Sequence, residues 1–159
     1  MNEHLKKLFE DCPQFAWSFT PLHGKKPFTK GWQSAPRETH REAMQWGARG
    51  NIGLRTGAAS GGLLVVDLDV DKEDYDIDAV LALELPDTIT AKTGRGGFHY
   101  YYQLPPGVVL GNSAAKLAPA VDTRGDGGQV VFPGSRHPET QTLYTFMPGR
   151  APWEIPLAE

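Results

Sequence analysis

The chain has 159 residues, a formal net charge of −3 and 40% apolar residues, values typical of one globular domain or of two small modules that share a core. The negative balance argues against a protein that coats nucleic acid through bulk positive charge. No apolar run is long enough to span a membrane, and the acidic, amphipathic N-terminus is unlike a signal peptide. The single cysteine excludes an internal disulfide and fits a reducing compartment, so we expect a cytoplasmic protein with no membrane partner.

The first half of the sequence alternates helical and strand-like apolar patterns. We expect, in chain order, a helix over 3–11, a strand over 15–22, a lysine-rich loop, a helix over 34–46, a strand over 51–57, a central strand over 62–70 and a helix over 76–85. Gly47 and Pro86 would end the second and third helices. This alternation predicts an α/β module over residues 1–87.

The second half contains strand-like runs separated by glycine-rich turns, which is the pattern of β-hairpins. We expect one hairpin from strands over 88–92 and 98–104, a second from strands over 120–124 and 129–135, and an edge strand over 142–146. Residues 88–150 would form a hairpin-rich module, followed by a tail over 151–159. Because no linker separates the halves, we expect a single α+β domain over 1–159 whose modules pack around one cleft.

An acidic motif closes the central strand, where Gly62 to Asp71 reads GLLVVDLDVD. Asp67 and Asp69 lie two residues apart, and strand alternation places their carboxylates on the same face. Two neighbouring carboxylates repel each other unless a cation lies between them. Mg²⁺ is typically held by one or two carboxylates together with substrate phosphates, so the motif predicts a divalent metal site.

Three other structures also fit the acidic motif in part. It could be a solvated strand end that runs into an acidic loop. A calcium-binding EF-hand loop would need glycine at its sixth position and glutamate at its twelfth, but Lys72 and Asp78 stand there, and we set it aside. A phosphatase of the haloacid dehalogenase type would use Asp67 as nucleophile and Asp69 as acid. Its fold needs repeated βα units, whereas hairpins follow residue 88, so it remains the second enzymatic interpretation.

A glycine-rich turn, TGRGG over residues 93–97, precedes an aromatic strand. The backbone N–H groups of Gly96 and Gly97 could approach an anion closely, because glycine has no side chain in the way. Arg95 could add a bidentate contact to a phosphate, and His99 follows at the start of the strand. The simpler alternatives are an ordinary hairpin turn and a packed or surface histidine.

Asp122 stands where a later strand meets its turn, and it could supply a third carboxylate to the metal site. Asp126 lies within that turn among glycines and is better explained as a turn former. Arg124 is a further candidate for contact with phosphates. A basic group earlier in the chain is either solvated loop charge or a rim for the phosphates of nucleic acid or of a triphosphate: Lys25, Lys26, Lys30 and Arg55.

Five segments, in this order, resemble the prim-pol family, the bifunctional DNA primase/polymerase N-terminal domain of the archaeo-eukaryotic primase superfamily. The segments are PLHGKKPFTKGW, NIGLRTG, GLLVVDLDVD, TGRGGFHYYY and VDTRGDGGQVVFPGS. The resemblance covers residues 15–146, and it is carried by the ordered set and by no single motif. It implies an N-terminal α/β module packed on a module with an RRM-like sheet.

The resemblance implies roles for the acidic residues and the histidine. Asp67 and Asp69 match the family's first motif, an acidic pair, and Asp122 matches its third, a carboxylate at a strand end. The second motif is commonly Ser-x-His, in which the histidine contacts the phosphates of the incoming nucleotide. His99 matches this histidine, whereas Gly97 stands at the position of the serine.

Other groups would therefore replace the contact of the missing serine, either backbone N–H groups or Arg95. A Pro-x-Ser sequence that follows the third motif in the family is present here over residues 133–135, next to Arg136. The family often carries a helical accessory domain and a helicase beyond this domain. It is found in bacteria and archaea, largely on plasmids, phages and other mobile elements.

We therefore expect a template-directed nucleotidyltransferase, a DNA primase/polymerase domain that adds nucleotides to a primer 3′-hydroxyl. Asp67, Asp69 and Asp122 would hold two Mg²⁺ or Mn²⁺ ions. Its partners would be ribo- or deoxynucleoside triphosphates and a single-stranded or primed DNA template. The triphosphate would be bound by Arg95, Gly96, Gly97, His99 and Arg124, and the DNA by Lys25, Lys26, Lys30 and Arg136. The alternative outside enzymes is a nucleic-acid-binding module without activity.

Overall fold

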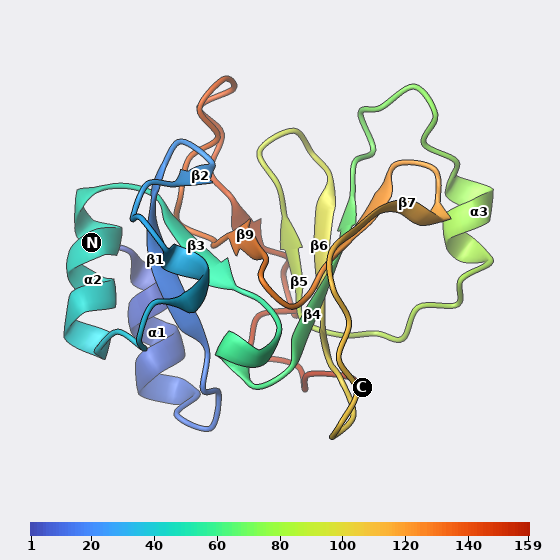
Figure 1. The fold of residues 1–159 in the computed structure, drawn as a ribbon. Helices are drawn as coiled ribbons and strands as arrows, with labels where there is room; N and C mark the ends of the chain where they lie inside the picture. The colour runs from blue at the N-terminus through green and yellow to red at the C-terminus, as the bar shows by residue number, and fades with distance from the viewer.

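The computed structural model describes all 159 residues and contains three α-helices and two antiparallel sheets. This confirms the predicted α+β class. Helices α1 and α2 lie on the outer side of the four-stranded sheet, and α3 lies beyond the six-stranded sheet at the opposite end of the molecule (Figure 1). None of the helices is both long and apolar enough to cross a membrane.

Capping side chains set where the first two helices begin. α1 (Glu3–Asp11) follows Asn2, whose side chain caps its first turn, and its bounds are those that the apolar spacing predicts. The predicted start of the second helix at residue 34 is wrong. α2 (His40–Arg49) begins only after Thr39, which forms a capping box with Glu42, and it continues through the glycine that was expected to stop it. Residues before it form the short 3₁₀ turn η1 (Trp32–Ser34).

The third helix is shorter than the apolar pattern predicts. α3 (Ile77–Leu81) begins after Asp76, whose carboxylate accepts hydrogen bonds from the backbone of the first turn. The helix does not reach residue 85, because Glu84 adopts a left-handed backbone conformation with φ of 51°. The chain then passes Pro86 and enters the second sheet.

The smaller sheet has the strand order β2–β1–β3–β9, and every neighbouring pair in it is antiparallel. Its strands are β1 (Ser18–His23), β2 (Lys26–Pro27), β3 (Ile52–Arg55) and β9 (Gln129–Val131). A second 3₁₀ turn, η2 (Ala58–Ser60), links β3 to the larger sheet. The turn between β1 and β2 brings Lys25 to the side of this sheet that faces the larger one.

The larger sheet has the strand order β10–β5–β6–β4–β8–β7 and is also antiparallel throughout. Its strands are β4 (Leu63–Leu68), β5 (Thr90–Lys92), β6 (Phe98–Gln103), β7 (Ser113–Ala118), β8 (Val121–Arg124) and β10 (Thr145–Phe146). The predicted hairpin of β5 and β6 is confirmed, and so is the edge strand near residue 145. β7 lies in a region where no strand was expected.

The second predicted hairpin, from residues 120–124 and 129–135, is wrong. β8 pairs with β4 and β7, whereas β9 pairs with β3 in the other sheet. The turn between them crosses from one sheet to the other and is held there by Thr56, which hydrogen-bonds to both Gly125 and Gly128. Both sheets thus draw strands from each side of residue 87, and the division into modules at that residue stays an expectation.

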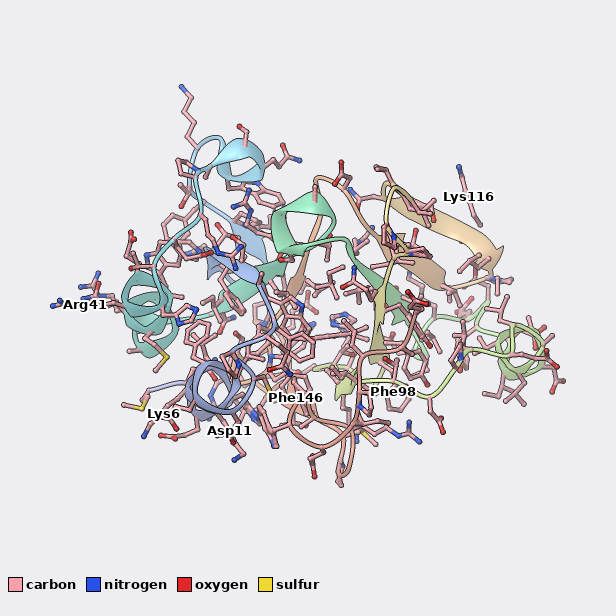
Figure 2. The ribbon with its side chains drawn as sticks, turned by 90° about the horizontal axis from the view of Figure 1, so that it is seen from below. Lys6, Asp11, Arg41, Phe98, Lys116 and Phe146 are labelled. Carbon is pink, nitrogen blue, oxygen red and sulfur yellow. The ribbon has the colours of Figure 1, made fainter.

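The main core fills the space between the two sheets and the first two helices. Its 17 buried members come from α1, α2, both sheets and the segments between them, and they include Leu5, Leu8, Ile52, Tyr101 and Phe146. Figure 2 shows Phe146 inside the molecule, while Arg41 and Lys116 project from its surface. A smaller core lies on the other face of the larger sheet, where Leu68 and Val121 pack near Val80 of α3. The larger sheet is therefore covered on both faces.

Candidate active site

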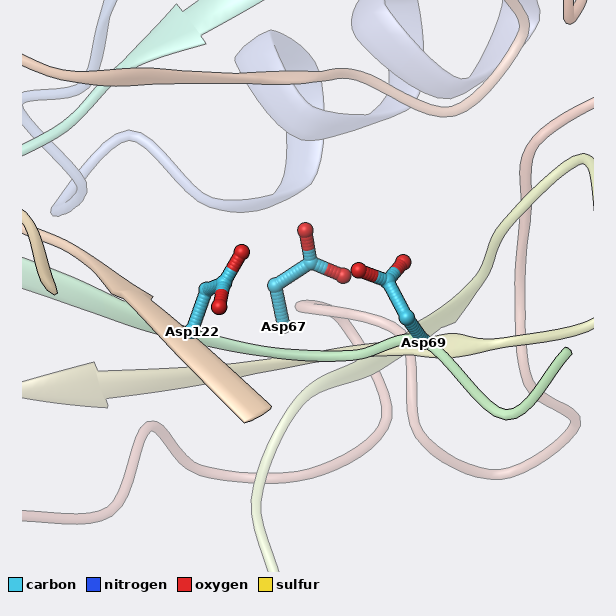
Figure 3. Close-up of side chains that lie close together, drawn as sticks. All are labelled: Asp67, Asp69 and Asp122. Atoms are coloured by element: carbon cyan, nitrogen blue, oxygen red, sulfur yellow. The ribbon is translucent and has the colours of Figure 1, made fainter. Parts of the chain in front are cut away.

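Three carboxylates meet where the central strands of the larger sheet end. Asp67 is paired in register with Asp122 on β8, and Asp69 follows directly after β4. One oxygen from each of the three side chains lies within 4.8 Å of the other two. Figure 3 shows all three carboxylates pointing to the same side of the sheet. The structure thus brings together the three acids that the sequence selects as metal ligands.

A cavity of about 240 Å³ opens beside these carboxylates and is lined by both sheets. The larger sheet and its turns contribute Asp67, Asp69, Thr93, Arg95, His99 and Arg124. The smaller sheet and the loops that flank it contribute Lys25, Gln129, Val130, Val131, His137 and Tyr144. Acidic residues and cationic residues therefore line the same space, as a site for a metal-bound phosphate compound requires.

Asp67 is stabilised by a histidine on the neighbouring strand. Nε2 of His99, its partner in register on β6, lies 3.4 Å from Oδ1 of Asp67. Burial alone would raise the pKa of Asp67, but the charge and hydrogen bond of His99, helped by Arg124 and Lys72, hold that pKa below its ordinary value. Asp67 is therefore ionised at neutral pH, and its partner His99 is only 5% exposed.

Asp69 carries the repulsion that remains in the cluster. Burial and the negative charge of Asp67 raise its pKa, although the Lys72 ammonium lies 3.2 Å from its Oδ2. Lys72 is half exposed, so this ion pair compensates the repulsion only in part. A divalent cation between Asp67 and Asp69 would remove the repulsion altogether.

Asp122 is oriented by the backbone of the edge strand β7. The Ala115 N–H donates to Oδ1 of Asp122 at 3.1 Å, and Arg124 lies 3.5 Å from Oδ2. Ala115 has a φ of 55°, and the β7–β8 register shifts around it. This irregularity in β7 turns an N–H group toward Asp122. The three carboxylates together form the all-oxygen donor set that Mg²⁺ and Mn²⁺ prefer, so these residues fit a divalent metal.

The glycine-rich turn after β5 does not offer the expected backbone donors. The Gly96 N–H donates to the carbonyl of Thr93, and the Gly97 N–H donates to the Thr93 hydroxyl at 3.0 Å. Both donors are already used within the turn, and neither glycine lines the cavity. The structure gives another reason for Gly97, since a Cβ atom there would lie 2.3 Å from the backbone oxygen of Leu68.

Arg95 and the expected DNA-binding residues lie around the mouth of the cavity or on the exposed surface. Arg95 lines the cavity, but its guanidinium contacts Glu139 and lies 3.9 Å from Asp71, so a phosphate would compete with two carboxylates. Lys25 lines the cavity as well. The other three expected cations are all exposed: Lys26, Lys30 and Arg136.

Arg55 does not belong to a basic rim, which corrects the expectation for this residue. It is 6% exposed, and its guanidinium donates to the Ser18 hydroxyl and to the carbonyls of Gln33 and Ala35. The arginine therefore holds the loop before α2 against β3. Asp126 lies apart from the three carboxylates and accepts a hydrogen bond from the Ala58 N–H at 2.7 Å, in agreement with its expected role in a turn.

Sequence reasoning missed His137 and Tyr144, which both line the cavity. A single histidine in a loop and a tyrosine in an edge strand carry no spacing signal, and only the folded loop over residues 133–144 brings them to the acids. Burial and the charge of Asp67 raise the pKa of Tyr144 to about 12, so its hydroxyl keeps its proton at neutral pH.

A larger cavity, of about 620 Å³, lies elsewhere on the molecule, between the loops over 57–62 and 103–110. Its charged lining residues are Asp126 and Glu159, so it offers no cation to a phosphate. Asp67, Asp69 and His99 line the smaller cavity between the sheets instead.

A scan of protein families matches residues 11–158 to the model of the bifunctional DNA primase/polymerase N-terminal domain, Prim-Pol. This chain belongs to the Prim-Pol family. The match covers almost the whole chain, and it agrees with the resemblance seen in the five sequence segments. Prim-Pol domains are nucleotidyltransferases of DNA primases and polymerases that act on nucleotides and DNA and use divalent metals. No curated protein matches the chain.

Membership of the Prim-Pol family also bears on the phosphatase interpretation. A haloacid dehalogenase fold is built from repeated βα units with a parallel sheet, and such parallel strands need long crossover connections. Every strand ladder in this Prim-Pol domain is antiparallel. The aspartates follow an apolar strand in both folds, but the strands around them here do not form the phosphatase architecture.

Proposed function

We propose that this domain is a template-directed nucleotidyltransferase that adds nucleotides to the 3′-hydroxyl of a DNA primer. The observation that carries the proposal is the group of three carboxylates within 4.8 Å of one another beside a cavity with cationic walls. A triphosphate substrate needs both parts, because the acids hold the metal and the cations balance the phosphate charge that the metal leaves uncompensated.

Asp67, Asp69 and Asp122 would hold two Mg²⁺ or Mn²⁺ ions. When bound, such ions lower the pKa of the attacking hydroxyl and neutralise charge on the departing pyrophosphate. The repulsion between Asp67 and Asp69 supports this assignment, because it has no full compensation from the protein. Asp122 is held in place by the Ala115 N–H at Oδ1, while its Oδ2 lies 3.5 Å from Arg124.

The cations of the cavity would bind and orient the triphosphate. His99 is fixed by Asp67 on one side of its ring, and Arg124 lies next to Asp122. Arg95 would exchange its contacts with Glu139 and Asp71 for a phosphate. Since His99 and Asp67 are neighbours in register on adjacent strands, the phosphate-binding group and the metal ligand keep a fixed separation.

Primed DNA would approach the side of the cavity where its exposed cations gather. Lys25 lies on the turn between β1 and β2, and Lys26 is the first residue of β2. The side chain of Asn51 links that turn to Arg136 by hydrogen bonds. Lys30 is exposed in the segment that follows β2. Contacts of this kind bind the DNA backbone without regard to its sequence. The overall RRM-like arrangement around a single catalytic cleft belongs to the same proposal.

The deciding experiment is extension of a labelled primer on a DNA template, in Mg²⁺ and separately in Mn²⁺, with ribo- and deoxynucleotides supplied in turn. We expect single-nucleotide additions that follow the template sequence and disappear in chelator. Release of phosphate from a simple phosphomonoester without extension would favour the phosphatase. Tight binding of primed DNA with neither activity would favour a module that only binds nucleic acid.

A further inference from the structure

His137 lies in the wall of the cavity, although no sequence motif marks it. The loop that carries it is fixed before the histidine by two residues, and after it by the Thr140 hydroxyl, which donates to the carbonyl of Gly94. Ser135 hydrogen-bonds to the backbone of Ile52 on β3, and Arg136 hydrogen-bonds to Asn51. His137 itself is 2% exposed. The residue is thus held within the smaller sheet's side of the site, opposite the acids of the larger sheet.

The backbone of its own loop determines which ring nitrogen of His137 carries the proton. Nδ1 accepts hydrogen bonds from the N–H groups of Glu139 at 3.1 Å and Thr140 at 3.3 Å. Burial and the positive charges of Lys25 and Arg95 lower the pKa of His137, so the ring is neutral at pH 7. A neutral imidazole that accepts at Nδ1 must donate at Nε2, and Nε2 has no hydrogen-bond partner in the protein.

Packing holds the His137 ring in this orientation. The ring is nearly parallel to that of Tyr144, at an angle of 15° with centroids 6.2 Å apart. A Cβ atom at Gly94 would lie 2.2 Å from Cβ of His137, so the turn after β5 can pack against this residue only because it has a glycine. Tyr144 in turn lies 6.3 Å from the ring of His99, so the two histidines flank one tyrosine.

The charges along this wall change sign from one histidine to the other. His99 lies against Asp67, and Tyr144 is influenced by Asp67 and Asp69. The pKa of His137, by contrast, is lowered first by burial and then by the positive charges of Lys25 and Arg95, against the smaller opposing effects of Glu139 and Asp71. A metal-bound triphosphate with its reacting phosphate near the acids would therefore extend its remaining phosphates toward His137. There a rigid N–H donor and two cations already converge.

We propose that His137 is a second nucleotide-binding histidine, whose Nε2–H donates to the terminal phosphates of the bound triphosphate. This inference rests on the proposed function, because it assumes that a nucleoside triphosphate is the substrate. It adds that the phosphates which leave as pyrophosphate bind on the side of the cavity that carries His137. His137 holds the part of the substrate that departs as pyrophosphate, while His99 holds the part beside the metal ligands. Its ring forms no bond with the substrate other than this hydrogen bond.

The sharpest variant is His137→Asn. Asparagine can accept hydrogen bonds from backbone N–H groups two and three residues ahead, as in an Asx-turn, so the loop keeps the contact that Nδ1 makes. The Nε2–H donor is lost, together with the ring that packs on Tyr144. His23→Asn is the matched control, because His23 is an exposed histidine on β1 that does not line the cavity. Thermal melting of both variants checks that the fold is retained.

Binding of a non-hydrolysable deoxynucleoside triphosphate analogue and of the corresponding monophosphate is measured by calorimetric titration in Mn²⁺. We expect His137→Asn to weaken triphosphate binding by about tenfold or more, as for loss of a hydrogen bond to a charged group, and to leave monophosphate binding unchanged. His23→Asn should change neither. Unchanged triphosphate binding, or equal weakening for both ligands, would overturn the assignment.

A second measurement uses the wild-type protein and does not depend on the stability of a variant. The ¹⁵N signal of Nε2 in His137 should shift on addition of the triphosphate analogue and not on addition of the monophosphate. A signal that stays in place at saturation would refute the contact. If the wild type binds no triphosphate at all in Mn²⁺, the proposed function fails together with this inference. If it prefers triphosphate and the variant does so equally, only the role of His137 fails.

Discussion

Two neighbouring rows of residues cross the larger sheet and have opposite surroundings. Each row takes one residue from β6, one from β4 and one from β8, paired in register. The first row is polar and lies on the side of the sheet where the carboxylates cluster: His99, Asp67 and Asp122. His99 and Asp67 also line the cavity. The second row is apolar and packs on the opposite face, toward α3: Phe98, Leu68 and Val121. The two rows are one residue apart along each strand, so the alternation of β-strands is what separates the carboxylate cluster from the apolar packing.

This arrangement makes the site depend on strand register. A slip of one residue in β4 would move Asp67 into the apolar layer and Leu68 into the cavity, and both exchanges are unfavourable. The apolar row therefore does more than fill space. It fixes the register that places Asp67 between His99 and Asp122.

The largest effect is expected from a change in the polar row that keeps its shape. Asp122→Asn should retain the hydrogen bond from Ala115 but lose a charged metal ligand, and we expect nucleotide addition to fall on the order of a thousandfold or more, since a catalytic metal supplies several kcal/mol. Asp126→Asn is the control, because Asp126 accepts a similar backbone hydrogen bond from Ala58 outside the cluster. Comparable losses of primer extension in the two variants would contradict the assignment of Asp122.

A substitution in the apolar row should lower the stability of the fold and leave the rate of nucleotide addition nearly unchanged. Leu68 is 1% exposed in the smaller core, so Leu68→Ala should lower the free energy of unfolding by about 3 kcal/mol, through lost burial and the cavity that remains. Urea titration measures this loss. Metal-dependent primer extension per folded molecule should stay close to that of the wild type at low temperature. If Leu68→Ala lost as much activity as Asp122→Asn with little change in stability, the assignment of a packing role to the apolar row would be wrong.

The sequence predicts the polar row well because the signal is local. Asp67 and Asp69 follow an apolar run, and alternation alone places them on one face. The order of five segments then adds His99 and Asp122, which are distant in sequence. α1 and the hairpin of β5 and β6 could be predicted for the same reason, since their apolar spacing and their turn lie within a few residues of one another.

Features that depend on distant partners could not be predicted in this way. The glycines between β8 and β9 indicate a turn, but hydrogen bonds from Thr56 decide that the turn connects two sheets. The N–H groups of Gly96 and Gly97 look available in the sequence because the role of Thr93 as their acceptor is not visible there. His137 and Tyr144 enter the site only through the packing of their loop.

Asp69 belongs to neither row, because it lies directly after the last residue of β4. Its carboxylate is part of the acidic cluster and is also partly exposed to solvent. Since its pKa is raised by burial and by Asp67, Asp69→Asn should not lower the melting temperature in chelator; the lost ion pair with Lys72 is exposed and worth little. Mn²⁺ at about a hundred times its dissociation constant should stabilise the wild type by roughly 2.7 kcal/mol and the variant much less.

Melting curves of both proteins, in chelator and in Mn²⁺, test the prediction for Asp69. If Asp69 instead holds the strand end through hydrogen bonds, the variant will be less stable by about 1–3 kcal/mol in either solution. That result, together with an unchanged melting temperature of the wild type in Mn²⁺, would show that the polar row does not bind a metal.

Gly97 connects the two rows, because it precedes the β6 residues that belong to each of them. A Cβ atom there would lie 2.3 Å from the backbone oxygen of Leu68 and 3.1 Å from the Thr93 hydroxyl. The backbone oxygen cannot move without shifting β4 against β6, so Gly97→Ala should destabilise the fold by about 2 kcal/mol, as overpacking commonly does.

Gly111→Ala is the control for Gly97→Ala, since no atom lies within 4 Å of the Cβ it would introduce, and we expect that variant to be as stable as the wild type. If Gly97→Ala matched this control in urea titration, then β6 would be free to move relative to β4. The fixed pairing of His99 with Asp67 could then no longer explain how the polar row is kept in place. If it is destabilised as expected, the glycine at the position where the family commonly has serine is a consequence of how closely these two strands approach.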